Sequence, residues 1–240
     1  HARAILLAYA ERYRSYKLHT IRGEEKVGGG RVMPQTLDEA VWLIPMAQAA
    51  DLVWDTLSPA DIETLRAQLF YPAAVDVIEK HHMGIHNIQC WKNTAVALVG
   101  LLFGDRDMVS RAVDGGFGFA NQMRKGIDED GAWYEGAWGY HFYTMSAMTP
   151  LVDACRNCGL KPDLSRYRKM FTVPLEMAMP DGTLPAFNDS AVATAVGNAN
   201  YEAALAWFGD PVLARAITPA TRRSIQALVH GIEKPPKGGA

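Results

Sequence analysis

The chain has 240 residues, and 49% of them are hydrophobic, which is enough for a sizeable buried core. Its formal net charge of −2 gives no electrostatic case for nucleic acid, and no apolar run reaches the roughly 18 residues of a membrane-spanning helix. We therefore predict no nucleic-acid partner and no membrane partner. Three cysteines do not suggest a disulfide framework, and we interpret Cys90, Cys155 and Cys158 as buried or half-buried thiols.

Helical patterns follow one another along the chain. The spacing of apolar residues and the residues at the boundaries predict eight to ten helices joined by short loops. No run alternates with a period of two, so we predict no strand. The main helical stretches are residues 4–13, 36–53, 58–80, 86–104, 105–125, 134–158, 164–179, 191–208 and 219–232.

Several boundaries have a chemical signature. Thr36, with Glu39 three residues later, predicts a capping box, and Ser58 followed by proline predicts the next helix start. Gly104 is typical of a left-handed helix end, and Pro174 predicts a kink. The glycines at 28–30 lack the strand-before, helix-after setting of a dinucleotide site, so we interpret them as a flexible crossing.

Paired antiparallel helices with polar loops at alternate junctions favour an all-α fold, an incomplete α/α toroid. A helical bundle and an α-solenoid are the rivals, but a solenoid should show a fixed repeat, and none is visible. We expect one toroid domain over residues 1–232 and a flexible tail over residues 233–240.

Polar and aromatic residues gather at two predicted helix starts. One is HHMGIHNIQCWKN (81–93), and the other is DEDGAWYEGAWGYHFY (128–143). One helix–loop–helix excursion separates them, so both can meet at one rim of a helical layer. That rim is the candidate site. His81 and His82 are adjacent and diverge, with no matching carboxylate at metal-binding spacing, so we predict no metal.

The two motifs resemble a known family. HNIQCWKNTAVALVGLLFGD (86–105) and GIDEDGAWYEGAWGYHFYTMSAM (126–148) are similar to the helical domain of the heparinase II/III-like and oligoalginate lyase group of polysaccharide lyases. The resemblance implies an α/α toroid followed by an antiparallel β-sandwich domain that supplies a further histidine. Residues after 231 could not encode this domain, so we expect the chain to be part of a larger enzyme. The resemblance implies a periplasmic or secreted enzyme, and a cytoplasmic location is the alternative.

The resemblance implies β-elimination on an acidic polysaccharide, of the heparin or alginate type, without a cofactor. A base removes the proton beside a uronate carboxylate, and uncharged donors must stabilise the charge that builds up there. Asn87 and His86 suit the carboxylate, and Tyr140, in a Tyr-His pair, suits the acid/base role. Tyr143 lies on the same helix face and is the rival phenol. Each also has a structural reading: Asn87 as a helix cap, His86 as a loop histidine and Tyr140 as a core residue.

Other residues suit substrate contact. Trp133, in a glycine-rich loop, is the best candidate for stacking on a sugar. Glu135 could reach a sugar hydroxyl or orient a catalytic group, and Asn188 and Asp189 could bind hydroxyls or stabilise their own turn. Gln35 lies beside the glycine loop and is a candidate for a distal sugar.

The family that these motifs resemble often carries a histidine at the position of Lys92. Its charge could bind a uronate, but a lysine does not shuttle protons at neutral pH unless its pKa is strongly perturbed. The substitution therefore implies either an altered enzyme or, if the position lies one helix face away from His86, a surface residue.

Two alternatives to a lyase stay open. Glu135 together with the acidic run 128–130 would suit a toroidal glycoside hydrolase acting on uronides through paired carboxylates. The third possibility is a carbohydrate-binding helical domain without catalysis. A lyase would release unsaturated product, a hydrolase reducing ends without a new chromophore, and a binding domain neither.

Overall fold

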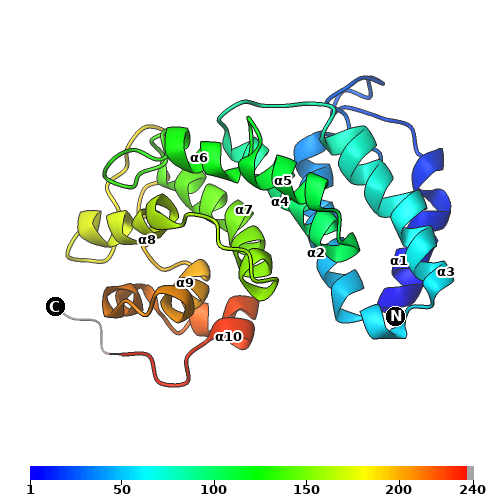
Figure 1. Cartoon of the computed structure of the whole chain (residues 1–240). Coiled ribbons are helices and arrows are strands. Elements are labelled where there is room, and N and C mark those ends of the chain that lie inside the picture. The colour runs from blue at the N-terminus through cyan, green and yellow to red at the C-terminus, as the bar shows by residue number, and fades with distance from the viewer. Residues whose placement is uncertain (237–240) are drawn as a thin grey trace. The chain divides into compact units, whose positions relative to one another are not determined.

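The structure is a computed structural model that describes residues 1–236, and it is built from helices (Figure 1). Within that range, pairing between extended segments is limited to isolated β-bridges, such as His19 with Gly30 and Thr183 with Ala195. The predicted all-α fold class is confirmed. None of the helices in this range is long and apolar enough to cross a membrane.

The chain divides into two compact units. Unit 1 comprises residues 1–121 and 150–161, and unit 2 comprises the remaining residues. Two of the three boundaries fall inside helices, α6 (Phe119–Gly126) and α7 (Trp138–Asn157), and the third lies in the loop after α7. The expected single domain over residues 1–232 stays a prediction. Part of the expected tail, residues 237–240, lies outside the described residues.

Unit 1 is organised around α4 (Asn87–Phe103), which packs against α2 (Thr36–Leu52) and α5 (Arg106–Asp114). Every residue from Gln89 to Gly100 except Trp91 is buried, because α4 has neighbours on several sides. The helix ends at Gly104 in the left-handed conformation, with φ of 70°, as predicted. Unit 1 also contains the end of α7, α1 (Ala2–Arg12) and a short 3-10 turn at Tyr13–Ser15.

The helical stretch from residue 59 to 78 changes pitch along its length. It begins as α3 (Pro59–Leu65), where Ser58 Oγ accepts the backbone N–H of Asp61 and the Asp61 carboxylate accepts that of Ser58. The predicted start is therefore confirmed. Two wider π-helical segments follow, Arg66–Phe70 and Pro72–Ile78. Pro72 has no N–H to donate within the α-helical ladder, which favours the change of pitch there.

The capping box predicted at Thr36 is wrong. Helix α2 has Gln35 at its N-cap without a side-chain cap, and Glu39 is completely buried. Its carboxylate accepts the Tyr13 hydroxyl at 2.6 Å and the backbone N–H groups of Val32 and Met33 at 3.1 and 2.9 Å. Burial raises the pKa of Glu39 despite these donors. Residues 32–33, which follow the glycines predicted to be a flexible crossing, are thus hydrogen-bonded to a buried side chain of the core.

Unit 2 contains α8 (Ser165–Met177), α9 (Asn200–Phe208) and α10 (Ile225–His230), with the start of α7. Pro174 lies inside α8. The helix predicted over 191–208 begins only at Asn200, because the backbone before it is paired elsewhere: Leu184 N–H donates to the Thr194 carbonyl at 2.8 Å. The helix predicted over 219–232 is likewise reduced to a 3-10 turn at Thr221–Arg223 and α10.

Candidate functional site

The loop before α7 is fixed by one buried tryptophan. Trp133 is 1% exposed; its backbone N–H donates to His141 Nδ1 at 3.2 Å, and its Nε1–H donates to Glu135 Oε2 at 2.6 Å. A ring without an exposed face cannot stack on a sugar, so the stacking role predicted for Trp133 is wrong. Tyr134, the next residue, is 44% exposed and offers a flat face instead.

His141 holds this loop through a hydrogen bond on each of its two ring nitrogens. Its Nδ1 accepts the Trp133 N–H, so the proton is on Nε2, which donates to the Met170 carbonyl at 2.8 Å. Burial lowers the pKa of His141 to about 4. The imidazole is therefore neutral at pH 7, and it joins the start of α7 to α8.

This burial makes stability depend on pH. The folded pKa of about 4 lies below the ordinary value of 6.5, so the unfolded chain takes up the proton first as the pH falls. The stability that the neutral His141 contributes is fully present above pH 6.5, and it is lost as the pH falls from 6.5 to 4. We expect the protonation of His141 in the unfolded chain to lower the free energy of unfolding by ~2 kcal/mol between about pH 7 and pH 5.

Chemical unfolding at the two pH values measures this loss. The variant His141→Gln should lose less free energy over the same interval, whereas replacing the partly exposed His19 by Gln should leave the wild-type loss unchanged. An equal pH dependence in His141→Gln would show that other groups cause it.

Two phenols lie exposed near the start of α7. Tyr140 and Tyr143 are 40% and 36% exposed and are three residues apart, which places them on one helix face as predicted. The hydroxyl of Tyr140 makes no hydrogen bond with any residue from 1 to 236. Thr144, one residue further, is completely buried. On this side of α7 the two phenols thus contact solvent, whereas the neighbouring Thr144 packs into the core.

The loop at 180–190 closes over this helix start. Trp138 donates its backbone N–H to Ser190 Oγ and its Nε1–H to the Pro185 carbonyl, both at 2.9 Å. Asn188 and Asp189 are exposed, and Asn188 has a positive φ of 47°. A Cβ placed on Gly136 would clash with Asn188 Nδ2. The side chains predicted to contact sugar hydroxyls therefore lie beside the loop that carries Glu135.

The other predicted helix start, that of α4, is in unit 1. His86 is the N-cap, and its Nδ1 accepts the backbone N–H of Ile88 at 3.2 Å. The remaining ring proton is then on Nε2, so His86 acts as a donor there. Asn87 is the first residue of the helix and is 4% exposed. That His86 and Asn87 meet Tyr140 around one sugar stays a prediction.

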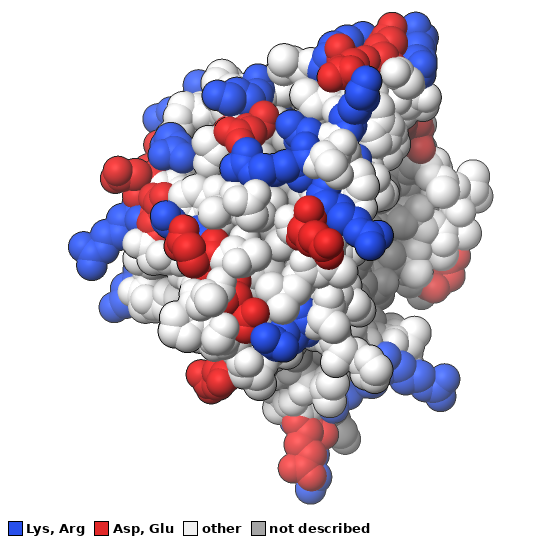
Figure 2. Space-filling model, turned by 90° about the vertical axis from the view of Figure 1, so that its right-hand side faces the viewer, with Lys and Arg blue, Asp and Glu red and all other residues white. Residues whose placement is uncertain are grey.

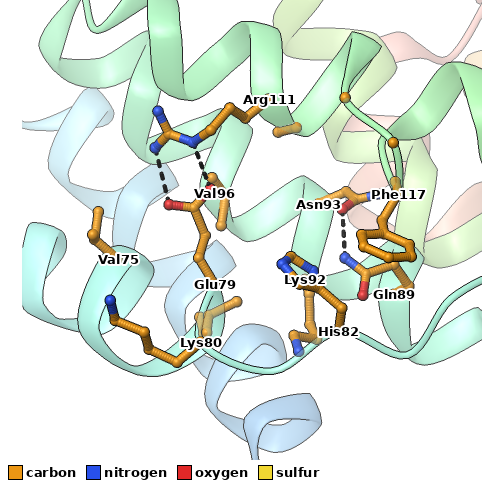
Figure 3. Close-up of a pocket in the computed structure, with 14 residues that line it drawn as sticks. Val75, Glu79, Lys80, His82, Gln89, Lys92, Asn93, Val96, Arg111 and Phe117 are labelled. Atoms are coloured by element: carbon orange, nitrogen blue, oxygen red, sulfur yellow. Dashed lines mark hydrogen bonds and ion pairs between the residues drawn. The ribbon is translucent and has the colours of Figure 1, made fainter.

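A pocket of about 430 Å³ lies beside α4 (Figure 3). The helix contributes Gln89, Lys92, Asn93 and Val96, which share one face through their i, i+3, i+4 and i+7 spacing. Three polar residues on one face of an otherwise apolar helix are a sequence pattern from which the pocket could have been predicted. Lys92 is 1% exposed, so the interpretation as a surface residue is wrong. Gln35 is half-buried and lies outside this pocket.

Residues 74–213, more than half of the chain, match the family model described as Heparinase II/III N-terminus. The chain belongs to this family. It is 30% identical over 159 residues to an alginate lyase from Stenotrophomonas maltophilia and 31% identical over 160 residues to an exo-oligoalginate lyase from Saccharophagus degradans. Each match covers 63% of the chain but 21% of the relative, so the chain spans about a fifth of these proteins.

Membership of the heparinase II/III N-terminus family agrees with the helical toroid predicted from the paired motifs. Both motifs, 86–105 and 126–148, lie inside the matched residues. The carboxylates that would suit a hydrolase have other surroundings: Glu135 accepts the Trp133 indole, and the acids at 128–130 are in an exposed turn.

Proposed function

We propose that the chain is the helical part of a polysaccharide lyase that cleaves a uronic-acid-containing glycan, alginate or a heparin-type polymer, by β-elimination. The observation that carries this proposal is Tyr140, an exposed phenol whose hydroxyl has no hydrogen-bond partner in residues 1–236, at a helix start that a buried tryptophan and histidine hold in place. Membership of the heparinase II/III N-terminus family and the relatives that are alginate lyases support the substrate class.

The proposed chemistry assigns each group a separate task. The Tyr140 oxygen, as phenolate, takes the proton beside the uronate carboxylate. The electron pair forms the new carbon–carbon double bond, and the glycosidic bond breaks. The leaving oxygen then receives a proton from the same tyrosine. Negative charge on the carboxylate is stabilised by the Asn87 amide and by the Nε2–H of His86, at the positive end of α4.

Supporting roles follow from exposure and contacts. Glu135 is proposed to hold the loop through Trp133 rather than to act on the bond. We assign contacts with sugar hydroxyls to Tyr143, Asn188 and Asp189, because their side chains are exposed. Gln35 is proposed for a more distant sugar. A periplasmic or extracellular location would bring the enzyme to such polymers.

The test is to incubate the natural full-length protein with alginate and with heparin-type glycans. We expect an ultraviolet absorbance from the unsaturated product, together with new reducing ends in equal amount. Reducing ends without absorbance would identify a hydrolase, and oligosaccharide binding without either would identify a binding domain. Absence of product on every uronate polymer overturns the proposal.

A further inference from the structure

The pocket beside α4 holds basic groups that its own residues do not balance (Figure 3). Lys92 lines it, and Lys92 Nζ is buried without a hydrogen-bond partner in residues 1–236. His82 lines it too, and His81 has a buried Nδ1 that is equally unpartnered in this range. The carboxylate in the lining, Glu79, binds the Arg111 guanidinium at 3.0 and 2.9 Å. The pocket therefore keeps an excess of positive charge.

The chain as a whole carries no such excess, because its formal net charge is −2. On the face of the molecule shown in Figure 2, basic and acidic side chains are interspersed rather than separated. Burial lowers the pKa of Lys92 to about 8. Burial also lowers the pKa of His81, and the nearby Lys92 charge adds to that shift. At pH 7 Lys92 is still mostly charged. An unpaired charge in this position opposes folding, which is a cost that a bound anion would offset.

The pocket walls are held in place by a chain of side-chain hydrogen bonds. Gln89 Oε1 accepts the Met83 backbone N–H at 2.9 Å, and Gln89 Nε2 donates to Asn93 Oδ1 at 2.8 Å. Asn93 Nδ2 then donates to the Phe117 carbonyl at 2.7 Å. Loops on either side of α4 are thus fixed to the helix face that carries Lys92, and a ligand meets a preformed site.

One wall of the pocket is flat and partly apolar. The His82 and Phe117 rings stack with their centroids 4.6 Å apart and their planes 21° from parallel. Both rings line the pocket. A buried cation beside an aromatic wall suits a ligand that has an anionic group on an apolar ring face, as a sugar acid does.

The pocket is separate from the carboxylate site proposed at the start of α4. Asn87 and Lys92 are five residues apart, which turns their side chains by about 140° around the helix axis. Neither His86 nor Asn87 lines the pocket. A uronate held by Lys92 is therefore a different sugar from the one that Asn87 would contact.

We propose that this pocket binds a second uronate of the polymer, with its carboxylate at the Lys92 ammonium and its ring against the His82–Phe117 stack. The identity of the ligand as a uronate rests on the proposed function. The excess charge and the preformed walls do not depend on it.

Calorimetric titration of the full-length protein with D-glucuronate, D-glucose and inorganic phosphate tests the proposal. We expect glucuronate to bind and glucose to bind at least about tenfold more weakly. Lys92→Met should weaken glucuronate binding by about tenfold or more, because it removes the charge-assisted contact. Its Tm should rise, which shows that the variant is folded. Lys161→Met, which removes an exposed lysine of the same unit, should bind as the wild type does.

Two further variants separate the possible sources of the anion. Phe117→Ala should weaken glucuronate binding but not phosphate binding. If phosphate binds as tightly as glucuronate and Phe117→Ala changes neither, the pocket takes a small inorganic anion and the sugar assignment is overturned. Glucuronate binding of wild-type strength in Lys92→Met overturns the site itself. Tyr140→Phe should leave binding at this pocket unchanged, so loss of lyase activity and loss of this site are distinguished.

Discussion

Replacing Tyr140 with phenylalanine is expected to lower kcat on the uronate polymer by about 10²- to 10⁴-fold, the usual contribution of a positioned acid/base group. The substitution removes one oxygen from a side chain that is 40% exposed and whose hydroxyl has no hydrogen-bond partner in residues 1–236. Stability should therefore change by less than about 0.5 kcal/mol. Initial rates of unsaturated product, with Tm as a folding check, measure both effects.

Two other tyrosines serve as matched controls. Tyr143→Phe removes the rival phenol on the same face, and Tyr134→Phe removes an exposed hydroxyl from the preceding loop while keeping its ring. Both are expected to change KM more than kcat, because their proposed contacts are to sugar hydroxyls or ring faces. A large kcat loss in Tyr143→Phe with full activity in Tyr140→Phe would transfer the acid/base role to Tyr143.

Helix existence could be predicted from sequence where the signal was local and strong. The apolar run in 86–104 with a terminal glycine, and the Ser-Pro start at 58–59, both led to correct helix boundaries. The stretch 191–199 was predicted as the first part of a helix over 191–208. Its backbone instead pairs with residues 183–184, which sequence spacing does not reveal.

In the candidate site too, features set by local sequence could be predicted, and features set by tertiary contacts could not. That Tyr140 and Tyr143 share a face follows from helical periodicity alone. Burial does not follow from it, and so Trp133 was given a role that only an exposed ring can perform, whereas Tyr134 beside it has the exposed face. Lys92 is a charged residue in an apolar helix, and its burial depends on loops at 80–86 and 115–118 that sequence analysis did not place.

Glu39 has the largest structural role that sequence analysis misread. Glu39→Ala is expected to destabilise the protein by about 3 kcal/mol or more. It leaves the Tyr13 hydroxyl and the N–H groups of Val32 and Met33 without their acceptor inside the core, and each unsatisfied donor costs about 1–3 kcal/mol. Removing a carboxylate whose pKa burial has raised offsets part of that cost. Equilibrium unfolding in urea gives the difference.

Glu39→Gln separates the shape of the side chain from its charge. An amide oxygen can still accept both backbone N–H groups, and the Tyr13 hydroxyl can turn to accept from the amide nitrogen, so less than half of the alanine loss is expected. Glu11→Ala, at an exposed position of α1, should change stability by less than about 0.5 kcal/mol. If Glu39→Ala unfolds at the wild-type urea concentration with an unchanged m-value, the buried carboxylate does not hold the 30–33 segment.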